Sequence, residues 1–191
     1  MRKKNLAPLL LAALLPVSAL AAPESYTIDP NHTYPHFAVA HLGGMSTMHG
    51  RFDETSGKIV MDRKAGTGSV EITIKAASLT TGHQKRDDHL RSPDFFNVAE
   101  FPTVTFKGNQ LKFNGENLTQ VSGNLTLLGV SKPVTLTVDA FKCGSHPMTK
   151  KEMCGADARA QIKRSDFGMK YGIPGVGDEL KLTFEVEAYK D

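Results

Sequence analysis

Four stretches of the chain alternate strictly between apolar and polar residues. They cover residues 68–75, 132–140, 156–163 and 179–188. In the first of them, Val70, Ile72 and Ile74 share one face, while Glu71 and Thr73 share the other. Alternate side chains of a β-strand point to opposite faces of its sheet, so each stretch predicts a strand with one apolar side. Strands of this kind are typical of antiparallel sheets that have one face in water.

Less regular runs of the same kind raise the number of predicted strands to about eight. They cover residues 34–42, 48–61, 103–113 and 118–128. Eight such strands must either stack as a sandwich or close into a barrel, and closure removes the exposed strand edges. We therefore predict an all-β fold, a single closed antiparallel β-barrel of about eight strands.

The interior of the predicted barrel contains several small residues. The positions counted as inward are Gly50, Gly123, Ala140, Ala156, Ala158 and Ala160. An eight-stranded barrel has the size at which side chains either fill the interior or leave room for one small ligand. The large residues that would fill it are Phe37, Phe52, Phe106 and Phe184. The alternation pattern leaves open whether the barrel is hollow or packed.

Residues 1–21 have the features of a secretory signal peptide. A basic start, MRKK, precedes an apolar run from Leu6 to Leu15, and the sequence ALA at residues 19–21 matches a cleavage site. About ten apolar residues are too few to span a bilayer, which needs roughly 20. We expect cleavage after Ala21, a mature domain of residues 22–191, a periplasmic location and no transmembrane segment.

The charge of the mature chain argues against a nucleic-acid partner. Three of the 23 basic residues lie in the signal peptide, which leaves 20 basic residues against 20 acidic ones. A protein that binds nucleic acid through its phosphates needs a basic surface. We therefore expect no nucleic-acid partner.

Cys143 and Cys154 are the only cysteines, and an exported protein meets an oxidising compartment. A disulfide across the loop between two strands is the favoured interpretation, and it would stabilise the fold by roughly 3 kcal/mol. The alternative is a soft-metal site that adds His146, Met148 and Met153.

Assigning alternate residues of each strand to opposite faces creates a difficulty for this disulfide. It places Cys143 on the outward face of its strand and Cys154 on the inward face of its own. A disulfide then requires a bulge, which we expect at Gly144 or Gly155.

The segment HQKRDDHLRSPDFF, residues 83–96, is rich in charge, and residues 83–91 are the only stretch that looks helical. His83 and His89 lie six apart, which separates their directions on a helix by roughly 120°, so no metal site is predicted there. Basic residues of the segment are candidates for anion binding. Alternatively, they pair with Asp87, Asp88 and Asp94 and simply order a crossover.

The chain contains no nucleophile elbow, phosphate-binding loop or dinucleotide fingerprint. Catalysis would need His41, His83, His89 and Asp88 to meet in three dimensions. A small hydrolase or isomerase acting on an apolar substrate therefore remains an alternative.

Several motifs together resemble one family. In chain order they are HTYPHFAVAHLGG, HGRFDETSGKI, RDDHLRSPDFFNVAEFPTVTF, GNLTLLGVSKPVTL, RSDFG and ELKLTFEVEA. They are similar to the successive signatures of the YceI-like proteins, which are exported, lipocalin-like β-barrels that bind polyisoprenoid chains. The resemblance covers essentially the whole mature chain.

The resemblance implies an apolar cavity that holds an isoprenoid lipid, such as a quinone or a polyprenyl phosphate, with the RDDHLRS motif near its mouth. It implies no catalytic residues and no cofactor, so we expect a binding protein rather than an enzyme. A ligand-free structural protein related to stress is a further alternative, and the sequence leaves a homodimer open.

The inward positions supply the expected site. The expected contacts of the apolar tail are Phe37, Val39, His41, Phe52, Val70, Ile72, Ile74, Leu125, Leu127, Leu136, Ala158 and Phe184. The expected contacts of the head group are Arg86, His89 and Arg91. Each inward residue is equally compatible with an ordinary core, and His41 is either a head-group contact or a core histidine bonded to the backbone.

Overall fold

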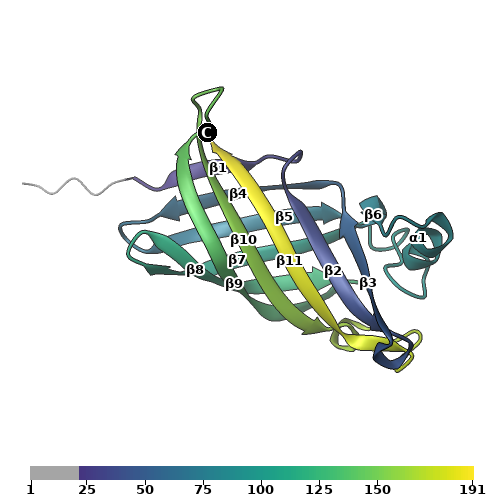
Figure 1. Cartoon of the computed structure of the whole chain (residues 1–191). Helices are drawn as coiled ribbons and strands as arrows, with labels where there is room; N and C mark the ends of the chain where they lie inside the picture. Colours follow the sequence, from purple (N-terminus) through teal and green to yellow (C-terminus); the bar gives the residue numbers. More distant parts are fainter. Residues whose placement is uncertain (1–21) are drawn as a thin grey trace, which may run out of the picture.

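Strand β11 (Val176–Lys190) closes the sheet, because it pairs with β10 (Glu152–Lys163) along much of its length and with β1 (Glu24–Ile28) at its end. The other strands of the ring are β4 (Thr55–Asp62), β5 (Thr67–Lys75), β7 (Thr103–Asn114), β8 (Asn117–Leu127) and β9 (Val130–Ser145). The computed structural model describes residues 22–191, and the predicted signal peptide lies outside these residues. The predicted closed, antiparallel, eight-stranded barrel is confirmed (Figure 1).

Three further strands extend the sheet from the other half of β11. They are β2 (Tyr34–His41), β3 (Ser46–Phe52) and β6 (Leu79–Thr80). β2 pairs with residues 176–185 of β11, whereas β1 pairs with residues 188–190. The wall beside β11 is therefore built by β1 at one end of the barrel and by β2, β3 and β6 at the other.

The predicted helical segment is α1 (Gln84–Arg91), which lies outside one end of the barrel (Figure 1). His83 caps its first turn, where its ring nitrogen Nδ1 accepts a hydrogen bond from the amide of Arg86. Buried Asp87 accepts a hydrogen bond from the amide of Thr81 at 2.9 Å. These contacts fix the helix to the short segment that precedes it.

Two parts of the predicted strand pattern are corrected. The run over residues 48–61 is two strands, β3 and β4, joined by a turn at Asp53 and Glu54. Strands β1 and β6 were not predicted. The turn breaks the alternation in the middle of the run, and strands of five and two residues are too short to give a clear pattern.

The cysteines form a disulfide, as predicted, so the soft-metal alternative for these thiols is wrong. Cys143 of β9 and Cys154 of β10 lie directly opposite each other, with their Cα atoms 4.0 Å apart. The expected bulge lies elsewhere. The register shifts between Asp157 and Ala158, opposite Asp139, and not at either glycine beside the cysteines.

This bulge explains how Cys143 and Cys154 come to lie on the same face of the sheet. The extra residue in β9 reverses the alternation beyond it, which turns Cys143 and Phe141 toward the core. The same shift leaves Ala140 exposed on the outer wall, so its predicted inward position is wrong.

Candidate functional site

An apolar cavity of about 110 Å³ lies inside the barrel. It touches both ends of β4, from Thr55 to Met61, a span of roughly 20 Å at the usual rise of a strand. Among the lining residues that the structure describes, only Thr33, Thr55 and Glu185 carry polar side chains. The Glu185 side chain is largely exposed, so the surface facing the cavity is almost entirely hydrocarbon.

Seven of the twelve residues predicted for an apolar tail line this cavity. They are Val70, Ile72, Ile74, Leu125, Leu136, Ala158 and Phe184. Phe37, Val39, Phe52 and Leu127 are buried in the core but do not border the cavity. The period-two pattern therefore identified seven residues that border one cavity, from strands β5, β8, β9, β10 and β11.

Sequence reasoning missed other lining residues, including Ile59, Met61, Leu118, Val121 and Val186. Most of them lie in the runs whose alternation is less regular. Thr55 was missed for another reason, because a threonine in a strand gives no signal that it borders an apolar cavity.

His41 does not lie inside the barrel, and its predicted inward position is wrong. It is the last residue of β2, and a turn begins at Leu42. The side chain is exposed because the strand has already passed the rim of the barrel. His41 instead borders a surface hollow that also contacts Arg86, His89 and Tyr171.

The three residues predicted for a head group are engaged with the protein itself. Arg91 donates hydrogen bonds to the carbonyl oxygens of Ala77 and Leu79, at 2.9 and 2.6 Å. Arg86 donates to the hydroxyl and the carbonyl oxygen of Thr81, at 2.7 and 3.0 Å. These contacts attach α1 to the barrel.

His89 is also engaged, since its Nε2 atom lies 2.8 Å from a carboxylate oxygen of Asp94. Its ring packs edge-on against the rings of Phe95 and Tyr171. Of the three predicted residues, Arg86 and His89 border the surface hollow, and none borders the interior cavity. A head-group role for them stays a prediction.

Aromatic rings close the α1 end of the barrel. The ring centroids of Phe37, Phe52 and Phe96 lie 5.4–6.0 Å from one another. A side chain at Gly50 would collide with Phe37, since a Cβ atom there would lie 2.4 Å from the ring. The Phe37 ring therefore fills the space that this glycine leaves. The cavity borders Ala156 and Ala158 instead.

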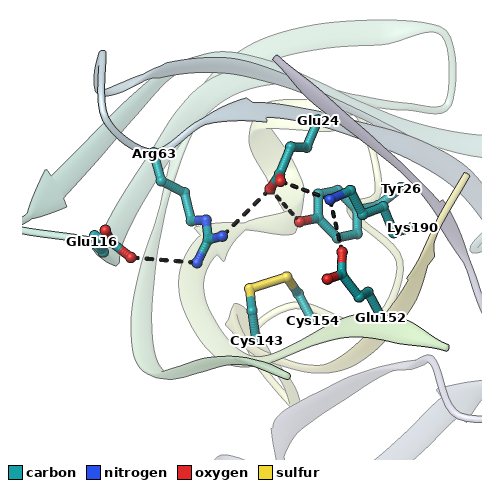
Figure 2. The surroundings of a disulfide bond; sticks show 8 residues. All are labelled: Glu24, Tyr26, Arg63, Glu116, Cys143, Glu152, Cys154 and Lys190. Atoms are coloured by element: carbon teal, nitrogen blue, oxygen red, sulfur yellow. Dashed lines mark hydrogen bonds and ion pairs between the residues drawn. A yellow bond between two sulfur atoms is a disulfide. The ribbon is translucent and has the colours of Figure 1, made fainter. Parts of the chain in front are cut away.

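A charged network lies near the disulfide at the other end (Figure 2). Tyr26 donates a hydrogen bond to Glu24 at 2.7 Å, and Lys190 donates to Glu24 at 2.8 Å and to Glu152 at 2.7 Å. Arg63 lies 3.4 Å from the same Glu24 carboxylate. These contacts join β1 to β10 and β11 where the ring of strands closes.

The network shifts the acid–base equilibria of its members. Hydrogen bonds from Lys190 and Tyr26 lower the pKa of Glu24 to about 2. Burial and the hydrogen bond to Glu24 raise the pKa of Tyr26 to about 12. The hydrogen bonds to Glu152 and Glu24 raise the pKa of Lys190. Glu24 is therefore charged and Tyr26 neutral across the physiological range.

The RSDFG motif at residues 164–168 supports the fold at the rim. Arg164 is buried and donates hydrogen bonds to the carbonyl oxygens of Met169, Tyr171, Val176 and Gly177. Burial lowers the pKa of this guanidinium. One buried cation therefore holds the whole loop between η3 (Arg164–Phe167) and β11.

One group outside the cavity has the geometry of a metal site. Ligand atoms of Asp29, His32 and Glu187 lie within 4.8 Å of one another. Nδ1 of His32 already lies 2.8 Å from a carboxylate oxygen of Asp29, so these two groups satisfy each other. Asp29 and His32 lie in the turn between β1 and β2, and Glu187 lies in β11.

An eight-stranded antiparallel barrel that encloses an apolar cavity is a barrel of the lipocalin-like class. Within residues 22–191, no helix is both long and apolar enough to cross a bilayer. The family model described as "YceI-like domain" matches residues 26–188. The chain therefore belongs to the YceI-like family, as its motifs predicted.

Relatives match over nearly the full length. A UPF0312 protein of Pseudomonas aeruginosa is 37% identical over all of both chains. Protein YceI of Salmonella heidelberg is 38% identical over 97% of each chain.

Solved structures share the fold. The YCEI protein of Campylobacter jejuni, 31% identical, covers 77% of this chain and 87% of its own, with a TM-score of 0.65. Burkholderia cenocepacia BcnA, 23% identical, covers 84% and 98%, with a TM-score of 0.71. A polyisoprenoid binding domain from Saccharophagus degradans, implicated in plant cell wall breakdown, is 19% identical, covers 88% and 99%, and has a TM-score of 0.65.

Proposed function

We propose that this protein binds and carries a polyisoprenoid lipid in the periplasm, with the tail inside the barrel. The observation that carries the proposal is the apolar cavity that touches strand β4 along roughly 20 Å. The name of the Saccharophagus degradans domain, which shares the fold, supports a prenyl ligand. The disulfide and the features of residues 1–21 support export and cleavage after Ala21.

The hydrophobic effect supplies enough free energy for such binding. Removing about 400 Å² of prenyl surface from water gives about 10 kcal/mol at roughly 25 cal/mol per Å², before the costs of association. Because a tail of that size is insoluble in water, a carrier in an aqueous compartment needs an interior of this kind. No polar contact is required for the main part of the affinity.

The lining must rearrange when a long tail binds. A cavity of about 150 Å³ holds a molecule of the size of benzene, and the cavity here measures about 110 Å³. The side chains of Met61, Leu118 and Leu182 border it. They are apolar, so no hydrogen bond holds them in place. We propose that they move aside as the tail enters.

The lining favours a binding protein over the alternative hydrolase or isomerase. No histidine, lysine, arginine or serine is found among the described residues that border the cavity. His89 faces the outer hollow and bonds Asp94, and His41 is exposed. The alternative predicts that replacing His41 or His89 by alanine abolishes turnover while the ligand is retained, whereas a binding protein has no turnover to lose.

The proposal is tested by purifying the protein from the periplasm of the cells that produce it, extracting it with organic solvent and analysing the extract by mass spectrometry. We expect about one prenyl lipid per chain. The matched control is the variant Ala158→Phe, expressed and extracted in the same way, which fills the cavity and should carry less lipid. An empty extract of the wild-type protein from cells with abundant prenyl lipids would support the ligand-free structural protein instead.

A further inference from the structure

Exposed apolar side chains gather on two loops at the α1 end of the barrel. The loops are residues 42–45, between β2 and β3, and residues 169–175, between η3 and β11, and we call them the rim loops. Six large apolar residues of the part that the structure describes are exposed. Four of the six lie in the rim loops: Leu42, Met45, Tyr171 and Ile173. Clustered apolar side chains on a surface mark a site of contact with a protein or a membrane.

The two rim loops are neighbours in space, although more than 120 residues separate them in the chain (Figure 1). The amide of Gly43 donates a hydrogen bond to the carbonyl oxygen of Gly175 at 3.2 Å. His41 and Val176, which flank the two loops, are paired between β2 and β11. The four apolar side chains therefore lie at one part of the rim.

The fold holds the rim loops in the shape that exposes these side chains. Buried Arg164 donates hydrogen bonds to the carbonyl oxygens of Met169 and Tyr171 in the second loop. In the first loop, Leu42 has a φ of 49°, in the left-handed region that bulky residues seldom adopt. The exposure of the apolar side chains is therefore built into the fold.

The charge around the rim loops favours an anionic partner. Residues 37–52 and 167–177 contain no aspartate or glutamate, and they include the exposed Lys170. Arg86 and three histidines border the surface hollow beside these loops, and no acidic residue borders it. The nearby Asp94 bonds one of these histidines. An anionic lipid surface matches both the apolar side chains and this charge.

We propose that the rim loops dock the protein on a phospholipid bilayer that contains anionic lipids, with the four apolar side chains inserted among the lipids. Apolar side chains beside basic ones attach a protein to a bilayer surface without crossing it. This inference rests on the proposed function and adds the partner, the membrane from which a prenyl lipid is taken or to which it is delivered.

Docking at the rim loops brings the aromatic cover of the barrel to the bilayer. The rings of Tyr171 and Phe95 have centroids 5.3 Å apart. Phe96, the next residue along the chain, packs on Phe37 and Phe52, which close this end of the barrel. The docked protein therefore presents the covered end of its cavity to the lipids, where a prenyl tail can pass with little exposure to water.

The opposite end of the barrel offers a rival site and a matched control. Met148 lies in the turn between β9 and β10, far from the rim loops (Figure 1). It is 82% exposed, against 87% for Met45, and Lys150 and Lys151 lie in the same turn. Replacing either methionine by serine removes a similar apolar surface, but only Met45 belongs to the rim loops.

Binding to lipid vesicles tests this inference. The mature protein is mixed with vesicles of phosphatidylcholine alone or of phosphatidylcholine with phosphatidylglycerol, and the bound fraction is measured by flotation. The variants are Leu42→Ser/Met45→Ser, Lys170→Gln and the control Met148→Ser. Binding of a short-chain prenyl alcohol to each protein, without vesicles, is measured separately, and circular dichroism checks each fold.

We expect the wild-type protein to bind the mixed vesicles more tightly than the neutral ones. The double variant should bind both at least about 10-fold more weakly, because two apolar side chains no longer enter the lipid. Lys170→Gln should weaken binding to the mixed vesicles alone, by about 5-fold, as for one basic residue near an anionic surface. Met148→Ser should bind as the wild type does. All four proteins should bind the prenyl alcohol equally.

Other outcomes separate the inference from the proposed function. If the folded wild-type protein binds the prenyl alcohol but no vesicles, docking is wrong while lipid carriage stands. If Met148→Ser weakens vesicle binding as much as the double variant does, the rim loops are not the docking site. If the wild-type protein is a dimer that the double variant dissociates, the rim loops join two copies instead. If vesicles bind and the prenyl alcohol does not, the proposed function fails and only the docking site stands.

Discussion

The ring of Phe96 meets the ring of Phe52 edge-on, with the ring centroids 5.4 Å apart and the planes at 84°. Phe52 ends β3, and Phe96 lies beyond α1 in the segment that covers this end of the barrel. The contact therefore joins the wall of the barrel to its cover.

Replacing Phe96 by alanine should loosen this cover. Removing a buried phenylalanine costs about 3–5 kcal/mol in the free energy of unfolding. We also expect a bound prenyl lipid to exchange faster, because Phe37 and Phe52 lose the ring that packs on both of them. Urea unfolding and the dissociation rate of a fluorescent prenyl probe measure the two effects.

Phe95→Ala is the matched control for this change. Phe95 is buried to a similar degree, but its ring packs against His89 and Tyr171 instead of the two barrel phenylalanines. It should reduce stability similarly and leave the dissociation rate near that of the wild type. Equal rates in both variants would show that the aromatic cluster does not limit release.

Replacing Ala158 by phenylalanine should block the cavity. Ala158 is buried in β10 and lines the cavity, and its cross-strand partners are Phe184 and Val138. We expect a folded barrel that binds a prenyl probe at least 10-fold more weakly, because the new ring occupies the space of the tail. Circular dichroism checks the fold and probe fluorescence checks binding. Ala140→Phe, on the outer wall, should bind normally, and unchanged binding by Ala158→Phe would place the tail elsewhere.

The strand pattern predicted the fold and much of the lining, because a barrel wall imposes the same alternation on every strand. Val70, Ile72 and Ile74 form one face in the sequence and border one cavity in the structure. The pattern failed where the backbone departs from it. A bulge at Asp139 reverses the alternation, so Ala140 was misplaced, and the end of β2 carries His41 past the rim.

The polar parts of the site could not be predicted, because their roles depend on which carbonyls and hydroxyls come near them in space. Arg91 bonds Ala77 and Leu79, which precede it by 14 and 12 residues, and no charge pattern indicates such partners. The unpaired hydroxyl of Thr55 is likewise visible only when all of its neighbours are known.

Reducing the disulfide should lower the stability of the barrel by about 3 kcal/mol, because the bond closes a loop between residues separated by 11 positions. For a chain of this size, the melting temperature should fall by roughly 6–12 °C. Thermal unfolding with and without reductant measures the change, and the double variant Cys143→Ser/Cys154→Ser in the absence of reductant should reproduce it. Free thiols in the unreduced, unfolded protein would contradict the disulfide.

The network around Glu24 should make stability depend on pH at both extremes. The pKa of Glu24 falls from 4.5 to about 2 on folding, so its contribution is complete above about pH 4.5 and disappears as the pH falls through about 2. The pKa of Tyr26 rises from 10.0 to about 12, so its contribution is complete below about pH 10 and is lost as the pH rises through about 12.

The variant Glu24→Gln tests this dependence. It should be less stable than the wild type at pH 7, and the difference should shrink as the pH falls from about 4.5 toward 2. Urea unfolding across this range gives both curves. Glu54→Gln is the control, because Glu54 and Lys75 form an exposed ion pair that should contribute little at any pH. A difference that stays constant between pH 7 and pH 2 would contradict the role of Glu24.

Calorimetric titration of the lipid-free mature protein with a soluble short-chain prenyl alcohol tests the central claim most directly. If the tail is buried inside the barrel, the protein takes up one ligand per chain with a clearly negative change in heat capacity, the mark of apolar surface leaving water. A folded protein that shows no saturable binding, or binding without a heat-capacity change, would contradict the claim that the barrel carries a lipid.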